Sequence, residues 1–479
     1  MNIVNLRTDG LAIRVATTAV AALLLLPSGV RAEVVRADGF LPPGLVSQVH
    51  NSTNVQSDST AQKTANAKNQ FSISLGHLTH GEVRAGGLPR DPALHQNMAD
   101  EVANFIMGRT RLTFDFRRDK LEAKAVAQNQ AVWGAKGNTA LAIYEAWARY
   151  SAKMGLFAQL GRIALSYDDE RIIGPNDWAM ASKTHDLIRA GYEGHGHKAH
   201  VLLAYNQNVE NLTTGTYYID GAQQYKSMQT LWYHFDVPKV PVGISLLFMN
   251  LGLQAGIPDE NEHQEHQQLI GGYLNAHPWR LTLEGSYYRQ MGHNENGKKI
   301  NAWMASGKAS LTLSKACTLQ AGYDYISGDD YVAVPKPGGL GTPEHKEIKG
   351  FTSLYGSRHK FYGVMDYFYE SAYLNGFTPG LQNAYVGVKL APMNRLNAKA
   401  SYHYMATATK LEGLSRTLGH DLEVEASYRL ASDVSLSVGF AYMNGTETMN
   451  RLKQGTSKQN VKWGWFSLVV TPSLFTTKW

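Results

Sequence analysis

The chain has 479 residues, of which 46 are lysine or arginine and 40 are aspartate or glutamate, so its formal net charge is +6. This weakly basic balance comes without a lysine- or arginine-rich tract, which argues against nucleic-acid binding. A single cysteine, Cys317, excludes an intrachain disulfide.

The first 32 residues have the features of a secretory signal peptide. Two arginines precede an apolar run at residues 15–26, and a small-x-small cleavage motif ends at Ala32. The run is shorter than the roughly 20 residues that a spanning helix needs. We therefore expect export through the inner membrane and a mature chain that begins at Glu33. Residues 33–69 are polar and poorly patterned, which predicts a disordered or periplasmic leader.

From residue 70 to the C-terminus the chain repeats segments of about ten residues in which apolar and polar side chains alternate. Residues 421–430 and 433–442 are two examples, joined by a short link at residues 431–432. In the first, the apolar face would consist of Leu422, Val424, Ala426, Tyr428 and Leu430. Alternation of this kind predicts strands with two unlike faces. About nineteen segments can be distinguished, and since bacterial barrels have even numbers, about 18 strands are expected.

The same alternation occurs in soluble β proteins, whose apolar face is a core. Three features favour a transmembrane antiparallel β-barrel instead. The apolar faces often end in tyrosine or tryptophan, as an interfacial girdle requires. Short and long loops alternate, and the long ones, at residues 174–183, 208–226 and 328–350, are polar as extracellular loops are. The chain ends on Trp479, an aromatic residue that resembles the assembly signal of outer-membrane barrels.

A barrel of about this size has a water-filled lumen, and the alternation assigns charged side chains to it. The basic residues assigned to the lumen are Arg111, Arg117, Lys124, Arg280, Lys308, Lys399 and Arg429. The acidic ones are Asp115, Glu122, Glu284, Asp324, Glu423 and Glu425. The lumen is therefore mixed in charge. Each basic residue could line a path for an anion or could belong to an ion pair inside the lumen.

One block of the sequence resembles a known family. From residue 161 it reads Gly-Arg-Ile-Ala-Leu-Ser-Tyr-Asp-Asp-Glu-Arg-Ile-Ile-Gly-Pro-Asn-Asp-Trp. This block is similar to one in the alginate-export family of outer-membrane barrels. The matching positions are Gly161, Arg162, Tyr167, Asp169, Arg171, Gly174, Asp177, Trp178, Asp186 and Arg189. A second block, residues 354–367, resembles a later block of the family and contains His359, Lys360 and Asp366.

The resemblance implies an 18-strand barrel with a lumen lined by arginine and lysine, through which a polyuronate chain diffuses outward. Candidate residues of that path are Arg162, Arg171, Arg189, Lys183, Lys360, Arg111 and Lys124. Lys183 stands where the family pattern has arginine, and His185 where it has an aromatic residue. The cargo is accordingly an anionic, alginate-like polysaccharide or its oligomers, or alternatively small nutrients and ions.

Signals for other functions are weaker. Asp168-Asp169-Glu170 lacks the spacing of a calcium loop, and neither His195-Gly196-His197 nor the histidines at 263 and 266 have zinc-motif spacing. No nucleophile–base set is recognisable. We therefore expect a passive pore with no enzymatic activity, no metal and no cofactor. The expected partners are outer-membrane lipid including lipopolysaccharide, the barrel-assembly machinery, and the anionic polysaccharide or small solutes.

Overall fold

The computed structural model describes residues 69–86, 102–135, 140–207, 225–257, 260–329, 347–365, 378–411, 413–453 and 460–479. The predicted signal peptide, residues 1–32, lies outside the described residues. So do Asp366 and all of the predicted leader, residues 33–69, except Asn69. Those assignments stay predictions.

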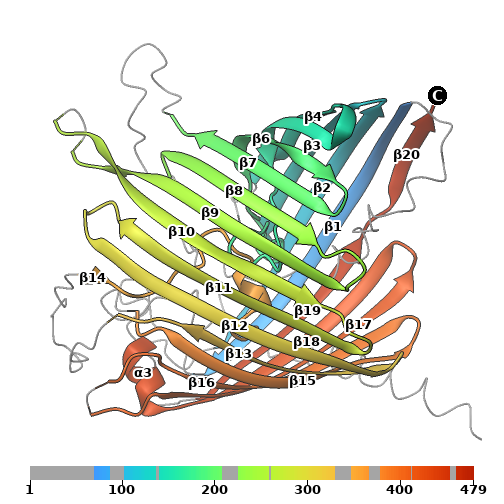
Figure 1. The fold of residues 1–479 in the computed structure, drawn as a ribbon. Coiled ribbons are helices and arrows are strands. Elements are labelled where there is room, and N and C mark those ends of the chain that lie inside the picture. Colours follow the sequence, from blue (N-terminus) through green and yellow to red (C-terminus); the bar gives the residue numbers. More distant parts are fainter. Residues whose placement is uncertain are drawn as a thin grey trace, which may run out of the picture.

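Twenty strands join in one continuous sheet (Figure 1). They are β1 (Asn69–Gly86), β2 (Ala103–Arg118), β3 (Leu121–Val132), β4 (Ala140–Ser151), β5 (Leu156–Ile163), β6 (His185–Gly194), β7 (His197–Tyr205), β8 (Ser227–Asp236), β9 (Val242–Ala255), β10 (His263–Ala276), β11 (Leu281–His293), β12 (Lys299–Ser314), β13 (Cys317–Ile326), β14 (Glu347–Ile348), β15 (Leu381–Met393), β16 (Leu396–Ala406), β17 (Thr417–Ala431), β18 (Val434–Gly445), β19 (Asn460–Val470) and β20 (Ser473–Lys478). Three short helical elements are η1 (Lys153–Gly155), η2 (Arg358–Lys360) and α3 (Glu447–Lys453). β14 is a two-residue segment in a loop, and β20 continues β19 along the same neighbour, which leaves the predicted 18 strands in the wall.

The wall closes on itself between the first strand and the last. β1 pairs antiparallel with β2 on one side, and on the other with β19 and then β20. The two last strands are separated at Pro472, whose nitrogen has no hydrogen to donate, although its carbonyl accepts a bond from Leu75 N–H at 3.1 Å. The backbones of Asn69 and Trp479 bond to each other in both directions at 3.1 and 3.2 Å. Closure leaves no free sheet edge, which lipid could not hydrogen-bond.

The connections differ between the two ends of the barrel. Turns of two residues join β2 to β3, β6 to β7, and β12 to β13 at one end, whereas the longest connections, from β5 to β6 and from β13 to β15, join strand ends at the other. In outer-membrane barrels the short turns are periplasmic and the long loops extracellular. We therefore call the end with the short turns periplasmic and the end with the long connections extracellular.

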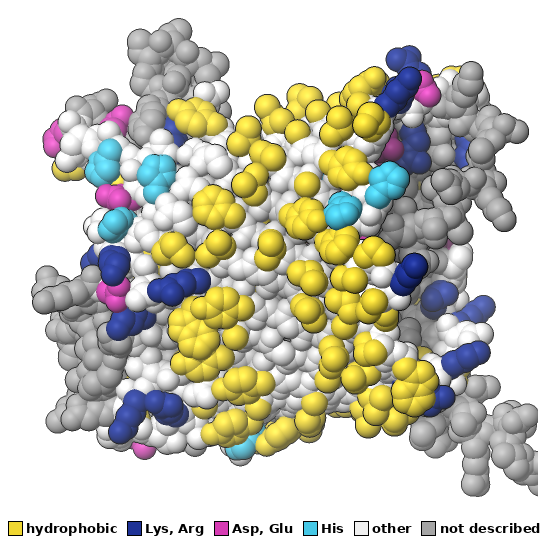
Figure 2. Space-filling view, viewed as in Figure 1, with side chains coloured by type: hydrophobic (Ala, Val, Ile, Leu, Met, Phe, Trp, Pro, Cys, Tyr) yellow, Lys and Arg dark blue, Asp and Glu magenta, His cyan; other side chains and the backbone are white. Residues whose placement is uncertain are grey.

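Alternate side chains face lipid and lumen as the sequence predicts. On β17, Leu422 and Val424 are 49% and 48% exposed, while Asp421 and Glu423 are 1% and 4% exposed. Hydrophobic side chains form a broad area across the middle of the outer wall, with charged and histidine side chains at its margins (Figure 2). No helix in the described part of the chain combines the length and apolarity needed to cross a bilayer.

Two extracellular connections fold into the barrel, and we call residues 164–184 and 351–365 the inner loops. Residues 174–183, expected as a polar extracellular loop, turn inward instead, and Trp178 and Met180 are 7% and 3% exposed. Leu165, Ile172 and Ile173 are at most 2% exposed, because the segment carries its own apolar side chains into the lumen. The short coil of η2, which belongs to the second inner loop, is visible inside the ring of strands (Figure 1).

Candidate functional site

The first inner loop crosses the lumen between opposite sides of the wall. Arg171 lies 3.2 Å from Asp324 on β13, measured between Nη2 and Oδ1. Six residues later, Asp177 lies 2.8 Å from Arg111 on β2, measured between Oδ1 and Nη1. The segment between these two ion pairs therefore spans the channel and narrows it.

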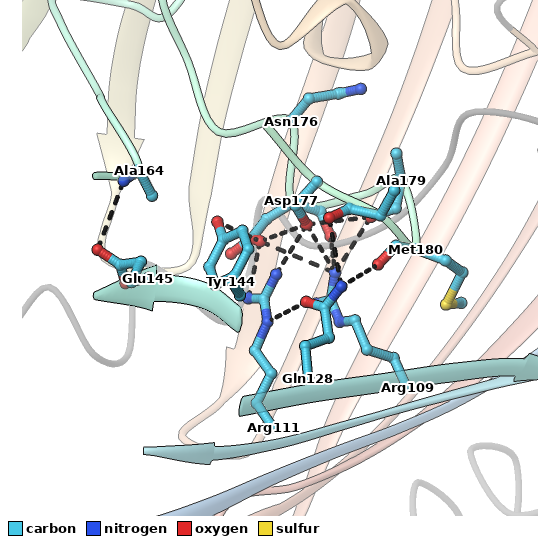
Figure 3. A network of polar contacts seen from close by, with 12 residues as sticks. Arg109, Arg111, Gln128, Tyr144, Glu145, Ala164, Asn176, Asp177, Ala179 and Met180 are labelled. Carbon is cyan, nitrogen blue, oxygen red and sulfur yellow. Dashed lines mark hydrogen bonds and ion pairs between the residues drawn. The ribbon is translucent and has the colours of Figure 1, made fainter. Parts of the chain in front are cut away.

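At the β2 end, one carboxylate holds two arginines (Figure 3). Besides Arg111, Asp177 lies 3.8 Å from Arg109, and these three side chains are 15%, 5% and 6% exposed, respectively. The Arg111 guanidinium also stacks on the ring of Tyr144 at 3.7 Å. Buried charges are stable only when they are paired. The pairing therefore fixes the position of the loop.

The backbone of the same loop is bonded to the wall as well. Arg109 Nη1 donates to the carbonyls of Asp177 and Ala179, both at 3.1 Å. Gln128 on β3 donates to the carbonyl of Met180 at 3.2 Å and accepts a bond from Arg111 Nε at 2.7 Å. The side chains converge on the loop from neighbouring strands in Figure 3. Arg111, predicted to line the cargo path, is thus committed to holding a loop.

At the β13 end, Arg171 is surrounded by partners. It lies 3.2 Å from Asp169 in its own loop and donates to the Tyr362 hydroxyl of the second inner loop at 2.8 Å. Its guanidinium also lies 3.9 Å from the centre of the Phe361 ring. Burial alone would lower the pKa of Arg171, but Tyr362, Asp324 and Asp169 hold it well above its ordinary value. Arg171 therefore joins both inner loops to the wall.

The two inner loops also contact each other directly. Ile173 and Tyr355 form a parallel bridge, and Gly174 N–H donates to the Tyr355 carbonyl at 3.0 Å. A Cβ atom on Gly174 would lie 2.4 Å from Ser357 Oγ, so the close approach of the loops requires glycine there. Lys183 donates to the Gly356 carbonyl at 2.9 Å.

Lys360 makes a further contact between the inner loops. Its ammonium lies 2.6 Å from the carboxylate of Glu170. Glu170 also accepts a bond from Ser166 at 2.8 Å. Lys183 and Lys360, both predicted for the cargo path, therefore connect one inner loop to the other.

An aromatic cluster anchors the loops against the closing strands. The rings of Trp178 and His359 are stacked at 3.7 Å with an interplanar angle of 11°. Trp178 also packs edge-on against Trp463 and Trp465 of β19, at 5.8 and 5.4 Å, and against His80 of β1. Burial lowers the pKa of His359 from 6.5 to about 3, so its ring is neutral at neutral pH.

A chain of polar contacts runs along the wall beneath the loops. Asn383 donates to Asp324 at 3.0 Å and accepts from His403 at 2.9 Å. His403 lies 3.5 Å from Glu423. Glu423 in turn accepts a bond from the backbone N–H of Val364 at 2.6 Å. The chain begins at the partner of Arg171 and ends on the second inner loop, so both loops are tied to one wall network.

The structure corrects the expected position of Arg162. Arg162 pairs in register with Ala146 and Asp186 on the neighbouring strands. Next to it, Leu160 is 59% exposed, and the flanking Ile163 is 2% exposed. Arg162 therefore lies on the outer face, near the extracellular rim, where it makes two hydrogen bonds of 2.8 and 2.7 Å to Asp186. Because alternate side chains of β5 face opposite sides of the wall, Arg162 points away from the lumen.

The remaining motif residues have structural contacts. Gly161 has a φ of +122°, and a Cβ atom there would lie 2.1 Å from the Ala146 carbonyl. The Tyr167 hydroxyl lies 2.9 Å from His200 Nδ1. Lys124 faces the lumen and pairs with Glu145 at 2.8 Å.

Arg189 and Lys389 are among the lumenal cations that lack a carboxylate within ion-pair distance in the described part of the chain. Arg189 on β6 donates to Gln159 at 3.0 Å, and Lys389 on β15 stands opposite Lys399 in register. Sequence reasoning included Arg189 but missed Lys389. Lys389 could have been found from the period-two pattern, because it alternates with Val386 and Leu390, which face outward.

In the described parts of the chain, no group of three histidine, cysteine, aspartate or glutamate side chains is arranged to hold a metal ion. The arrangement instead offers a lumen of mixed charge that two fixed loops narrow. These features define an outer-membrane channel.

The sequence profile of the alginate export family matches residues 81–419, well over half of the chain. The protein belongs to this family. Among curated proteins, none matches the sequence significantly.

Solved structures share the fold at low sequence identity. Pseudomonas aeruginosa OccK5 (OpdH) is 10% identical with a TM-score of 0.56, and the match covers 85% of this chain and 98% of that one. Pseudomonas aeruginosa OpdL is 13% identical with a TM-score of 0.54, and the match covers 85% of this chain and 99% of that one. Acinetobacter baumannii OccAB1 is 10% identical with a TM-score of 0.54, and the match covers 85% of this chain and 97% of that one. These likenesses establish the barrel fold.

Proposed function

We propose that this outer-membrane channel passes an anionic polysaccharide of the alginate-like polyuronate kind, or its oligomers, by passive diffusion. The observation that carries the proposal is the pair of lumenal positions Arg189 and Lys389, whose positive charges have no carboxylate within ion-pair distance among the described residues. Membership in the alginate export family supports the same cargo. Export by the predicted signal peptide and insertion by the barrel-assembly machinery are part of this proposal.

The physical reason is electrostatic. A polyanion that enters a narrow channel loses part of its hydration and needs positive charge along its path. Arginine and lysine supply that charge, and a carboxylate can bind the arginine fork through two oxygens. Many weak sites along the path let the chain leave again, so diffusion requires no energy source.

A second candidate is a channel for small nutrients or ions, and a specific observation favours it. The first inner loop crosses the lumen between Asp324 and Arg111. Arg111, Lys124, Arg171 and Lys360 are all paired with carboxylates. A narrowed lumen whose charges are largely neutralised lets small solutes pass and offers little attraction to a polyanion.

Planar-bilayer recordings of the purified protein distinguish the two candidates. A polyuronate channel is expected to give a reversal potential that indicates anion preference, and polyuronate oligomers should block its current. Cation preference without block by these oligomers would remove the first candidate and favour the second.

The selectivity test has a matched control within the chain. Arg189→Gln and Lys389→Gln should each reduce anion preference and weaken block by uronate oligomers, because each removes an unneutralised lumenal charge. Arg162→Gln should leave both unchanged, because Arg162 faces outward. If all three variants showed the same anion preference and the same block by uronate oligomers, a role of Arg189 and Lys389 in the path would be contradicted.

A further inference from the structure

The apolar area of the outer wall ends at a defined row on β8 to β12. Cross-strand register aligns Leu231, Phe248, Ile270, Arg289 and Trp303 in one row. The four apolar members are between 38% and 53% exposed, as lipid-facing side chains are. Arg289 is the charged member of this row.

The next row toward the extracellular end is polar. Register aligns Gln229, Asn250, Gln268, Met291 and Asn301. Asn250 donates to Gln229 at 2.6 Å, and Gln268 donates to Asn250 at 2.9 Å. A hydrogen-bonded row of amides on the outside of a barrel belongs at the level of the lipid headgroups, since hydrocarbon cannot solvate it.

Arg289 reaches from the last apolar row into this polar row. Its Nη2 donates to Asn301 Oδ1 at 3.0 Å, and among the described residues no carboxylate lies within ion-pair distance of it. Two other cations on the outside near this end are neutralised: Arg162 pairs with Asp186 at 2.7 Å, and Lys299 pairs with Glu347 at 2.9 Å. Arg289 thus keeps its positive charge at the boundary.

Figure 2 looks onto this wall. Hydrophobic side chains cover its middle, and basic, acidic and histidine side chains gather beside them on the left, the side on which the β9 and β10 tips project in Figure 1. Trp303, next to Arg289, packs on Tyr325 at 4.6 Å and lies 6.1 Å from Tyr287. Aromatic side chains of this kind favour the membrane interface.

We propose that Arg289 binds the phosphate of an outer-leaflet lipid headgroup, with Asn301 positioning its guanidinium and Trp303 against the adjoining part of the lipid. A guanidinium can bind two phosphate oxygens at once. The apolar rows below Arg289 lie in the hydrocarbon, so a headgroup phosphate of the extracellular leaflet comes to the level of Arg289. The site is on the outside of the wall and does not depend on the cargo.

Native mass spectrometry of the detergent-solubilised barrel tests the proposal, with bisphosphorylated lipid A and its dephosphorylated counterpart as probes. The unmodified protein should retain the phosphorylated lipid, and Arg289→Gln should weaken retention roughly five- to tenfold. The dephosphorylated lipid should bind both proteins equally weakly. Equal retention of lipid A by the unmodified protein and the variant would overturn the proposal.

Arg280→Gln is the matched control. Arg280 lies beside Trp279, 5.1 Å from its ring, in the periplasmic turn that precedes β11, so its loss should not affect retention of lipid A. Unchanged heat-modified electrophoretic mobility would show that both variants fold. Inorganic phosphate at the concentration of the lipid should not displace it; displacement would indicate a simple anion site and overturn the assignment to a lipid.

Discussion

At the scale of single residues, buried ion pairs determine where the inner loops lie. Asp177 serves two arginines that are 6% and 15% exposed, and Arg171, 5% exposed, has two carboxylate partners. Removing one member of such a group leaves a charge in a poorly solvated position, which typically costs about 3 kcal/mol or more. These residues therefore act on the channel through the loop that they hold.

Asp177→Asn should release the β2 end of the first inner loop, because Arg109 and Arg111 would face each other without a negative charge. The expected result is a larger and less steady single-channel conductance. Glu122→Gln is the control, since the Arg117–Glu122 pair is more exposed, at 64% and 34%, and such pairs contribute about 1 kcal/mol or less. The same conductance in both variants and the unmodified protein would contradict the role given to Asp177.

At the scale of elements, the inner loops form one unit by packing on each other and on the wall. Trp178 and His359 come from different loops and stack against β19. The carboxylates Glu82, Glu423 and Glu425 and the ammonium of Lys399 act electrostatically on His359. A histidine buried in this way gives the packing of the loops a dependence on pH.

Acidification should loosen the inner loops. Burial lowers the pKa of His359 from 6.5 to about 3, so between these values a released loop binds a proton that the packed loop does not. The free energy that favours the packed loops over the released ones is therefore largest above pH 6.5 and decreases as the pH falls toward 3. Conductance recorded from pH 7 down to pH 4 should therefore rise reversibly.

The variant His359→Phe isolates this contribution from the titration of carboxylates. Phenylalanine keeps an aromatic ring against Trp178 but cannot bind a proton. The rise in conductance on acidification should be smaller in this variant. A pH response identical to that of the unmodified protein would assign the effect to other groups.

At the scale of the whole molecule, stability depends on closure of the wall. β20 pairs with residues 70–74 of β1, and the bonds between Asn69 and Trp479 complete the seam. Without this segment, the first part of β1 would present unpaired backbone groups to lipid, each of which is costly.

Deletion of residues 473–479 should prevent refolding into detergent micelles, as judged by loss of the heat-modifiable electrophoretic form. Trp479→Ala should refold in the same assay, because the backbone ladder of β20 remains. In cells the same variant should insert less efficiently if the barrel-assembly machinery reads the terminal aromatic residue. Normal refolding of the deleted chain would show that the seam does not require β20.

The sequence by itself determined the wall. Alternation with a period of two is a local property, and each segment such as residues 421–430 carries it without reference to any other part of the chain. The number of strands, the lipid-facing side chains and the lumenal position of residues such as Arg111 and Lys124 followed from it. The family block also pointed to the residues that matter, including Gly161, Gly174 and Asp177.

Only the tertiary structure decided what those residues contact. No local pattern indicates that residues 164–184 turn inward, because that depends on apolar and charged partners on strands distant in sequence, such as Asp324 for Arg171 and His80 for Trp178. The outward position of Arg162 likewise follows from its register with Ala146 and Asp186. Strand periodicity is encoded residue by residue, whereas the pairing of buried charges is settled only when the closed wall brings them together.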